Sequence, residues 1–259
     1  MIDLHNHLVP GVDDGAATPD EARAGLQAMR AQGVHTLVAT PHLNGTATVA
    51  SGALEEWFRR VDPAFATLRE LAAQAGVRVE PGAEVMLDTP APDLSDPRVR
   101  LAGTDYVLVE FPFMTIPPNA PQVLFDLQMR GWKPVLAHPE RYHNLDPELD
   151  GPREWRRVGA VLQVNAGSVL GRYGAEARAA AWRMLREGLA DLLCSDFHAR
   201  GEPRLQAAGA ALHQAGGAEQ AELLMEANPG RVIAGEPLLA VPPLAEPAGF
   251  WGRLFGRRR

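Results

Sequence analysis

The first sixteen residues, MIDLHNHLVPGVDDGA (1–16), bring together an apolar segment, two histidines one residue apart and an acidic pair. Alternate residues of a β-strand point to the same side, so His5 and His7 can address one site together. The acidic pair Asp13 and Asp14 follows, directly before a glycine. The stretch therefore predicts a buried strand that delivers metal-binding side chains at its carboxyl end.

Six further segments repeat the pattern of a short run rich in Val, Leu or Ile. They are HTLVATPH (35–42), VRVEPGAEV (77–85), DYVLVEFP (105–112), KPVLAHPE (133–140), AVLQVNAGSV (160–169) and ADLLCSDFH (190–198). Each is apolar on both faces near its middle, as buried parallel strands are. Helical patterns separate them, so the alternation predicts one barrel-like α/β domain.

The first helix carries the clearest boundary signals. Thr18 is placed as the N-cap, Pro19 at the first helical position, Glu21 as the partner in a capping box and Gly33 as the stop. Further helices are expected over residues 54–76, broken at Pro63, and over 119–131, 174–188 and 202–227. We assign residues 1–235 to the domain and 236–259 to an appended tail, rich in proline and then basic and aromatic.

Composition narrows the class of protein. A net charge of −7 over 259 residues argues against nucleic-acid binding, and no apolar run reaches the eighteen residues of a membrane span. The N-terminus lacks the features of a signal peptide. With Cys194 as the single cysteine, no intrachain disulfide can form. We expect a cytoplasmic protein.

Potential metal ligands end six of the seven predicted strands. They are His5 and His7, His42, Glu84, Glu110, His138, and Asp196 with His198. Taken singly, each is more simply a capping or exposed side chain. In a parallel barrel, however, all carboxyl ends share one rim, where active sites gather. Burying so many unpaired charges is costly, so the set predicts a multinuclear metal site. Imidazole and carboxylate without thiolate favour Zn, Mn or Fe, and clustered ions commonly hydrolyse phosphate esters.

These motifs, HxH, the acidic pair, ATPH, PGAE, VEFP, LAHPERY and SDFH, resemble the PHP (polymerase and histidinol phosphatase) superfamily. Within it they are most similar to the bacterial protein-tyrosine phosphatases that partner capsule and exopolysaccharide tyrosine kinases. The resemblance covers about residues 1–235, including NPGRVIAGE (228–236). Asn6 and the Phe of SDFH depart from the usual pattern without removing a ligand. The implied fold is a distorted (β/α)7 TIM-like barrel.

The resemblance also implies divalent metal ions, three per chain, with manganese expected and zinc or iron as alternatives. Carried over by motif, the ligand sets are His5, His7, Asp196 and a bridging Glu84; Glu84, Glu110 and His138; and His42, His198 and Asp14. Asp13 remains open as the alternative to Asp14, because the spacing does not separate them.

Two arginines are expected to bind phosphate by the same resemblance. Arg141 lies in the HPER motif, and its guanidinium fork suits a phosphate group; a surface ion pair with Glu140 is the alternative. The second arginine follows SDFH, where Arg200 and Arg204 both qualify and we select Arg204.

A rival mechanism is contained in CSDFHAR (194–200), which fits the Cys-x5-Arg spacing of cysteine-dependent tyrosine phosphatases. That mechanism needs a thiolate cradled by a glycine-rich loop. Here the loop has no glycine, and Asp196 would repel the substrate and raise the thiol pKa. Cys194 is therefore interpreted as a buried strand residue.

Three functions stay open from the sequence. The first is a metal-dependent phosphatase acting on phosphotyrosine of a membrane-linked bacterial tyrosine kinase. The second is a small-molecule phosphatase such as histidinol phosphatase, and the third is a non-enzymatic metal-binding regulatory subunit. The apolar side chains of Phe111, Phe113, Met114 and Tyr142 either receive an aromatic ring or pack the barrel edge. The tail GFWGRLFGRRR (249–259) is either a solubilising end or a weak contact for an anionic membrane surface.

Overall fold

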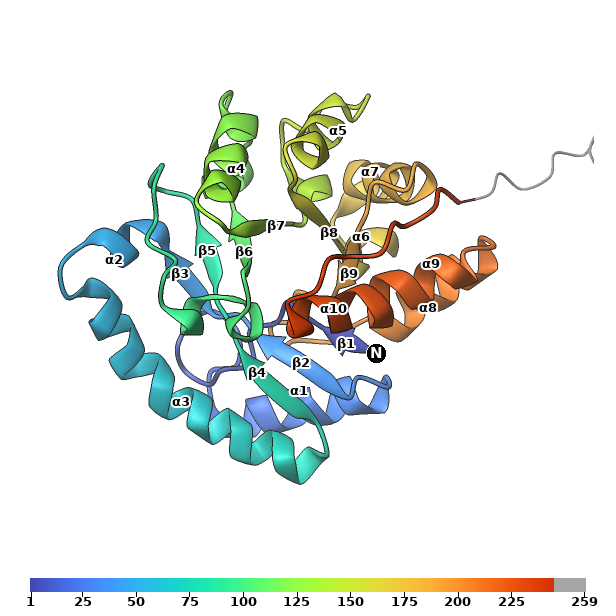
Figure 1. Cartoon of the computed structure of the whole chain (residues 1–259). Helices are drawn as coiled ribbons and strands as arrows, with labels where there is room; N and C mark the ends of the chain where they lie inside the picture. The colour runs from blue at the N-terminus through green and yellow to red at the C-terminus, as the bar shows by residue number, and fades with distance from the viewer. Residues whose placement is uncertain (245–259) are drawn as a thin grey trace, which may run out of the picture.

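The computed structural model describes residues 1–244, in which parallel strands follow one another around a ring with helices on the outside (Figure 1). One sheet has three strands in the order β1 (Ile2–Asp3), β2 (Thr36–Ala39) and β4 (Arg78–Pro81). The other has six, in the order β3 (His42–Asn44), β5 (Glu84–Met86), β6 (Tyr106–Glu110), β7 (Lys133–Ala137), β8 (Val161–Asn165) and β9 (Leu192–Cys194). All strand pairs are parallel, so their carboxyl ends face one side.

The barrel is distorted because two of the seven predicted strands are each divided in two. The second breaks at Pro41, which has no N–H for the ladder, and the third at Gly82. A Cβ at Gly82 would lie 2.9 Å from a methyl carbon of Val38, so the chain passes too close there for a larger residue. The ring is completed where the first segment meets the last, through a parallel bridge between Asn6 and Phe197. The predicted (β/α)7 barrel class is confirmed, with its strands shared between two sheets.

The first helix, α1 (Pro19–Ala31), begins as the sequence predicts. The Thr18 hydroxyl accepts a hydrogen bond from the backbone N–H of Glu21, and the Glu21 carboxylate accepts one from Ala17. Leu26 and Met29 turn one apolar face toward the barrel and are fully buried.

The predicted break at Pro63 is wrong, because α3 (Ala53–Ala75) runs through it without interruption. Proline removes one backbone hydrogen bond, but Pro63 is exposed, so water can satisfy the freed carbonyl. Trp57, Phe58 and Leu68, buried on both sides of the proline, hold the helix against the barrel. Tertiary packing therefore outweighs the local cost of the proline.

The remaining helices include several that the sequence pattern did not predict. The predicted ones are α4 (Ala120–Met129), α7 (Gly174–Arg186), and α8 (Leu205–Gln214) with α9 (Ala218–Glu222) in place of one helix over 202–227. A π-helical turn (Leu223–Ala227) then leads into α10 (Asn228–Ala234). Not predicted were α2 (Gly45–Val49), α5 (Asp150–Arg157), α6 (Ala166–Val169) and the 3₁₀ turns Pro97–Val99, Leu101–Gly103, Pro112–Met114 and Pro139–Arg141.

The first part of the predicted tail, residues 236–244, lies against the domain. The side chain of Asn228 donates to the carbonyl of Leu239 at 3.0 Å and accepts from its N–H at 2.8 Å. Val241 and Leu244 are buried. The basic aromatic segment 249–259, with its predicted membrane contact, lies outside the described residues. Across residues 1–244, no helix combines the length and apolar character that a membrane crossing needs.

Candidate metal centre

Nine side chains proposed as ligands from the sequence converge on one another in the structure. His5 and His7 follow β1, His42 and Glu84 begin β3 and β5, Glu110 ends β6, His138 follows β7, Asp196 and His198 follow β9, and Asp14 comes from the loop after the first strand. Four groups of these residues have ligand atoms within 4.8 Å of one another. The groups are His5, His7 and Asp196; His5, Glu84 and His138; His42, Glu84 and Glu110; and His7, Asp14, His42 and His198.

The two histidines of the first strand are oriented by hydrogen bonds on their outer nitrogens. His5 Nδ1 donates to Gln163 Oε1 at 2.9 Å, and His7 Nδ1 donates to Asp13 Oδ2 at 2.8 Å. With Nδ1 holding the proton in each neutral ring, both Nε2 atoms present lone pairs inward, 3.3 Å from each other. In this neutral state the two facing lone pairs repel at that distance. A cation between them removes the repulsion.

The structure gives Asp13 and Asp14 different environments. The Asp13 carboxylate accepts from His7 and from the backbone N–H groups of Gly15 and His42. Asp14 Oδ1 lies 3.4 Å from Nε2 of His42 and 3.4 Å from Nε2 of His198. Asp14 is thus the aspartate that faces the cluster, while Asp13 supports a histidine from behind, as carboxylates beside metal-bound histidines do.

Glu84 lies at the middle of the cluster and is only 1% exposed. Its Oε1 is 3.2 Å from His138 Nε2, and its Oε2 is 3.1 Å from His42 Nδ1 and 3.3 Å from His5 Nε2. The two oxygens therefore face different histidines, which is the arrangement a bridging carboxylate needs.

One predicted ligand set is divided in the structure. Glu84 groups with His138 on one side and with Glu110 on the other, and Glu110 lies 3.7 Å from His42. The strand register accounts for this difference, because Glu84 is paired with Leu108 and Glu110 with Met86, two residues further along. Glu110 consequently reaches the cluster beside His42 and Glu84.

Two of the nine residues have a left-handed backbone. His138 has a φ of 36° and Asp196 a φ of 50°, in a region that is costly for residues other than glycine. Such strain persists where the surroundings impose it, and it is concentrated at functional sites. At the ends of β7 and β9 it turns the two side chains into the cluster.

Of the seven predicted strands, the one without a candidate metal ligand is β8, and it supplies amide side chains that support the cluster. Gln163 holds His5, and Asn165 Nδ2 donates to Asp196 Oδ2 at 3.2 Å. The backbone N–H of Asn165 in turn donates to the buried carboxyl of Glu140. The sequence analysis did not predict these supporting roles. The signal that could have indicated them is the presence of two amide side chains in the apolar run AVLQVNAGSV.

Arg141 lies at the edge of the cluster. Its Nη1 is 2.5 Å from Asp196 Oδ2, and the guanidinium carbon lies 4.1 Å from the ring centre of Tyr173. No ion pair joins Arg141 to Glu140 in residues 1–244, so the surface ion pair considered above is not formed. Arg200 is exposed, while Arg204 is partly buried with an unpartnered Nε; within the described chain neither forms an ion pair with the cluster.

Burial and the mutual charges shift the pKa values of these groups. Burial favours neutral histidine, but Glu84 and Asp196 outweigh it and raise the pKa of His5 to about 9. Burial tends to raise the pKa of Glu84, yet the surrounding histidines hold it well below its usual range. Burial, followed by the charge of Glu84, raises the pKa of Glu110 to about 7. The metal-free cluster therefore retains protons that a bound cation would displace.

The cluster fits divalent metal ions in both spacing and donor type. Ligand atoms about 2.1 Å from one ion lie roughly 3.0–3.4 Å from each other, and the closest pairs here are 3.1–3.4 Å apart. The buried Nδ1 of His138 has no partner in the described residues. Imidazoles and carboxylates without thiolate match manganese, iron or zinc.

Cys194 is not part of the cluster of candidate metal ligands. Its side chain is fully buried in an apolar cluster with Leu4, Leu108 and Val135. Burial raises the pKa of the thiol well above its usual range, so a thiolate is not available there. The buried position agrees with the interpretation of Cys194 as a strand residue.

The aromatic residues near the rim divide between packing and exposure. Phe111 and Tyr142 are buried, and the Tyr142 hydroxyl accepts from the Phe111 N–H at 2.8 Å. Phe113, by contrast, is 90% exposed and has a left-handed backbone. Phe111 and Tyr142 therefore pack the barrel edge, and Phe113 offers an apolar surface to the solvent.

Known proteins are similar to this chain in both sequence and fold. Tyrosine-protein phosphatase YwqE of Bacillus subtilis is 32% identical over 201 residues, covering 76% of this chain and 77% of its own. Tyrosine-protein phosphatase CpsB of Streptococcus pneumoniae is 29% identical over 251 residues, covering 90% and 98%. A solved structure from work on these two proteins, described as unique metal-dependent tyrosine phosphatases, matches with a TM-score of 0.77 and 30% identity over 95% of this chain and 99% of its own.

A protein-family model also matches this chain. The model described as "Capsular polysaccharide synthesis, CpsB/CapC" matches residues 1–234, which contain all nine clustered side chains and Arg141. The chain therefore belongs to the CpsB/CapC family of capsular polysaccharide synthesis.

Proposed function

We propose that this protein is a metal-dependent protein-tyrosine phosphatase. The observation that carries the proposal is the cluster of buried imidazoles and carboxylates with Arg141 at its edge. Such a centre suits hydrolysis of a phosphate monoester, since clustered cations and a guanidinium both attract phosphate oxygens. The relatives named tyrosine-protein phosphatase support phosphotyrosine as the substrate.

We propose three divalent ions, with manganese as the metal. Their ligands would be His5, His7 and Asp196 for the first; Glu84 and His138 for the second; and His42, His198 and Asp14 for the third, with Glu110 taking part beside His42 and Glu84. The spacing and donor types above support this set. Bound divalent ions lower the pKa of water toward neutrality and neutralise charge on the phosphoryl group.

The residues of the chain orient both the centre and the substrate. Asp13 and Gln163 fix the imidazole rings of His7 and His5, so that both Nε2 atoms stay free for coordination. Arg141, held by Asp196 and stacked on Tyr173, would donate its remaining N–H groups to phosphate oxygens. In the net reaction water adds to phosphorus, the bond to the tyrosine oxygen breaks, and that oxygen takes up a proton.

Arg204 is proposed as the second phosphate-binding arginine. Its buried Nε has no partner among the described residues, which supports a role in binding a ligand. Arg200 is exposed, so its guanidinium can be satisfied by water and does not indicate a ligand in the way that Arg204 does.

The protein substrate is proposed to be a membrane-linked bacterial tyrosine kinase of polysaccharide synthesis, met in the cytoplasm. The family description, capsular polysaccharide synthesis, supports a substrate in that process. The composition of residues 249–259, basic and aromatic, would favour an anionic membrane surface near such a kinase.

A substrate panel tests the proposed function. The purified protein, with manganese added, is assayed for phosphate release from a phosphotyrosine peptide, the matching phosphoserine peptide and histidinol phosphate. We expect the phosphotyrosine peptide to have the highest kcat/KM. A preference for histidinol phosphate would replace the proposal with a small-molecule phosphatase, and no release from any substrate would favour a non-enzymatic subunit.

A further inference from the structure

A cavity of about 730 Å³ opens beside the metal centre. It lies between the segment that follows β7, residues 140–149, and one face of helix α7. Its lining includes Arg141, Leu145, Asp146, Tyr173, Glu176 and Ala180. We call it the α7 cleft. A volume of this size is typical of a site that encloses a ligand.

The α7 cleft is continuous with the metal centre through Arg141. This arginine lines the cleft and also contacts Asp196, one of the proposed ligands, at 2.5 Å. Tyr173 lines the cleft as well, and its ring lies under the Arg141 guanidinium. A substrate phosphate held by Arg141 would therefore place the rest of its molecule at the mouth of the cleft.

Gly167 makes room for this junction. A Cβ at that position would lie 2.9 Å from Cε2 of Tyr173, so the ring can occupy its place only over a glycine. The Gly167 N–H also donates to Asn165 Oδ1, and Asn165 donates to Asp196. The cleft wall and the metal centre are thus built on one short segment after β8.

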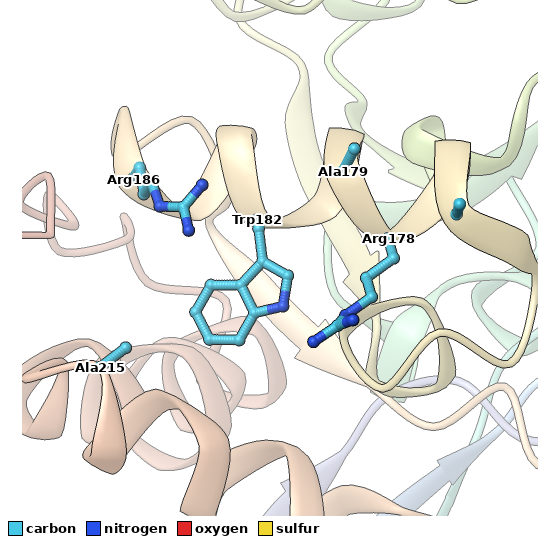
Figure 2. Close-up of a pocket in the computed structure, with 6 residues that line it drawn as sticks. Arg178, Ala179, Trp182, Arg186 and Ala215 are labelled. Atoms are coloured by element: carbon cyan, nitrogen blue, oxygen red, sulfur yellow. The ribbon is translucent and has the colours of Figure 1, made fainter.

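Helix α7 borders the cleft on one side and a second cavity on the other, and Ala179 lines both. Tyr173, Glu176 and Ala180, at helical spacing, line the α7 cleft. Arg178, Trp182 and Arg186 turn to the other side, toward Ala215 of the segment after α8 (Figure 2). That second cavity contains none of the nine clustered side chains and not Arg141.

The lining of the cleft indicates what it can hold. Leu145 and Ala180 are partly buried apolar residues, and the small alanine leaves space along the helix. Arg183 also lines the cleft, but it is paired with Glu148 and Glu187. Glu176 is exposed and has no ion-pair partner in residues 1–244, so its part of the rim carries an unneutralised negative charge. This chemistry suits an extended polypeptide with apolar and basic side chains, and a small phosphate ester would leave it empty.

We propose that the α7 cleft binds the polypeptide segment that flanks the phosphotyrosine of the substrate. The proposal rests on the proposed function, since it takes the phosphotyrosine to be held at the metal centre by Arg141. The cleft then adds contacts to neighbouring residues and makes a phosphorylated polypeptide a better ligand than phosphotyrosine alone.

Binding tests the proposal separately from turnover. The probe is a fluorescent peptide with a non-hydrolysable difluorophosphonate in place of phosphotyrosine, flanked by leucine and lysine. Its Kd for the manganese-loaded protein is measured by fluorescence anisotropy for wild type and for Ala180→Trp, which fills the cleft. The matched control is Ala175→Trp, on the same helix but lining the second cavity. We expect Ala180→Trp to weaken peptide binding at least tenfold and the control to leave it unchanged.

A second variant leaves the fold at less risk, because Glu176 is exposed. Glu176→Lys should weaken the lysine-containing peptide at least threefold and strengthen a peptide with glutamate at the same position. Equal affinity of wild type and Ala180→Trp, each with the same metal content and melting temperature, would overturn the proposal. So would an identical response of both peptides to Glu176→Lys. If the cleft variants behave as expected while wild type hydrolyses no phosphotyrosine substrate, the proposed function is wrong, but the proposal that the α7 cleft binds the peptide is retained.

Discussion

Replacement of Arg141 by alanine tests how the protein holds the substrate phosphate. In the structure Arg141 donates to Asp196 at 2.5 Å and keeps other N–H groups for a ligand. A hydrogen bond to a charged group is worth about 1.5–3 kcal/mol, which corresponds to a loss of roughly 10–150-fold in kcat/KM. Asp196 stays bound to Asn165 at 3.2 Å, so we expect the metal content to remain that of wild type.

The assay is phosphate release from a phosphotyrosine peptide at several concentrations, with metal content measured on the same sample. Arg141→Lys keeps the charge without the planar fork and should fall between wild type and alanine. Arg172→Ala is the control, because Arg172 is exposed and lies 5.6 Å from the same Tyr173 ring. Unaltered kinetics in Arg141→Ala would refute phosphate binding, and a parallel loss of metal would show that Arg141 acts through Asp196 instead.

Four further substitutions separate the remaining roles. Cys194→Ala should keep kcat/KM within about twofold while lowering the melting temperature, because it removes buried volume and no reactive group; an inactive, fully metal-loaded variant would restore the cysteine mechanism. Asp13→Ala should weaken metal binding by roughly 10–100-fold in a chelator competition, because His7 loses its orienting carboxylate; unchanged affinity would contradict that role. Arg204→Ala should lower kcat/KM by about tenfold or more and Arg200→Ala should leave it unchanged; the reverse result would exchange their assignments.

The convergence of the candidate metal ligands could be predicted because it follows from a simple property of parallel barrels. All carboxyl ends face one side, so ligands at the ends of separate strands converge whatever their distance in the sequence. His42 and His138, almost a hundred residues apart, both lie against Glu84 for this reason. The grouping of the ligands was less predictable, since it depends on strand register, which places Glu110 beside His42.

Other features depend on packing that a sequence pattern does not contain. The uninterrupted helix through Pro63 is held by buried residues on both sides of it, and the local signal alone indicates a break. The supporting roles of Gln163 and Asn165 depend on which strands become neighbours around the ring. Tyr173 reaches Arg141 only because Gly167 leaves space for its ring, and nothing near Tyr173 in the sequence indicates that contact.

Metal content measured together with activity shows whether a centre of several metal ions performs the hydrolysis. Protein purified without chelator is analysed for metals per chain, stripped with EDTA, assayed on a phosphotyrosine peptide, and assayed again after titration with manganese. We expect more than one ion per chain before stripping, loss of activity with the metal, and recovery that needs more than one equivalent of manganese. A preparation that is free of metal and fully active would contradict this expectation.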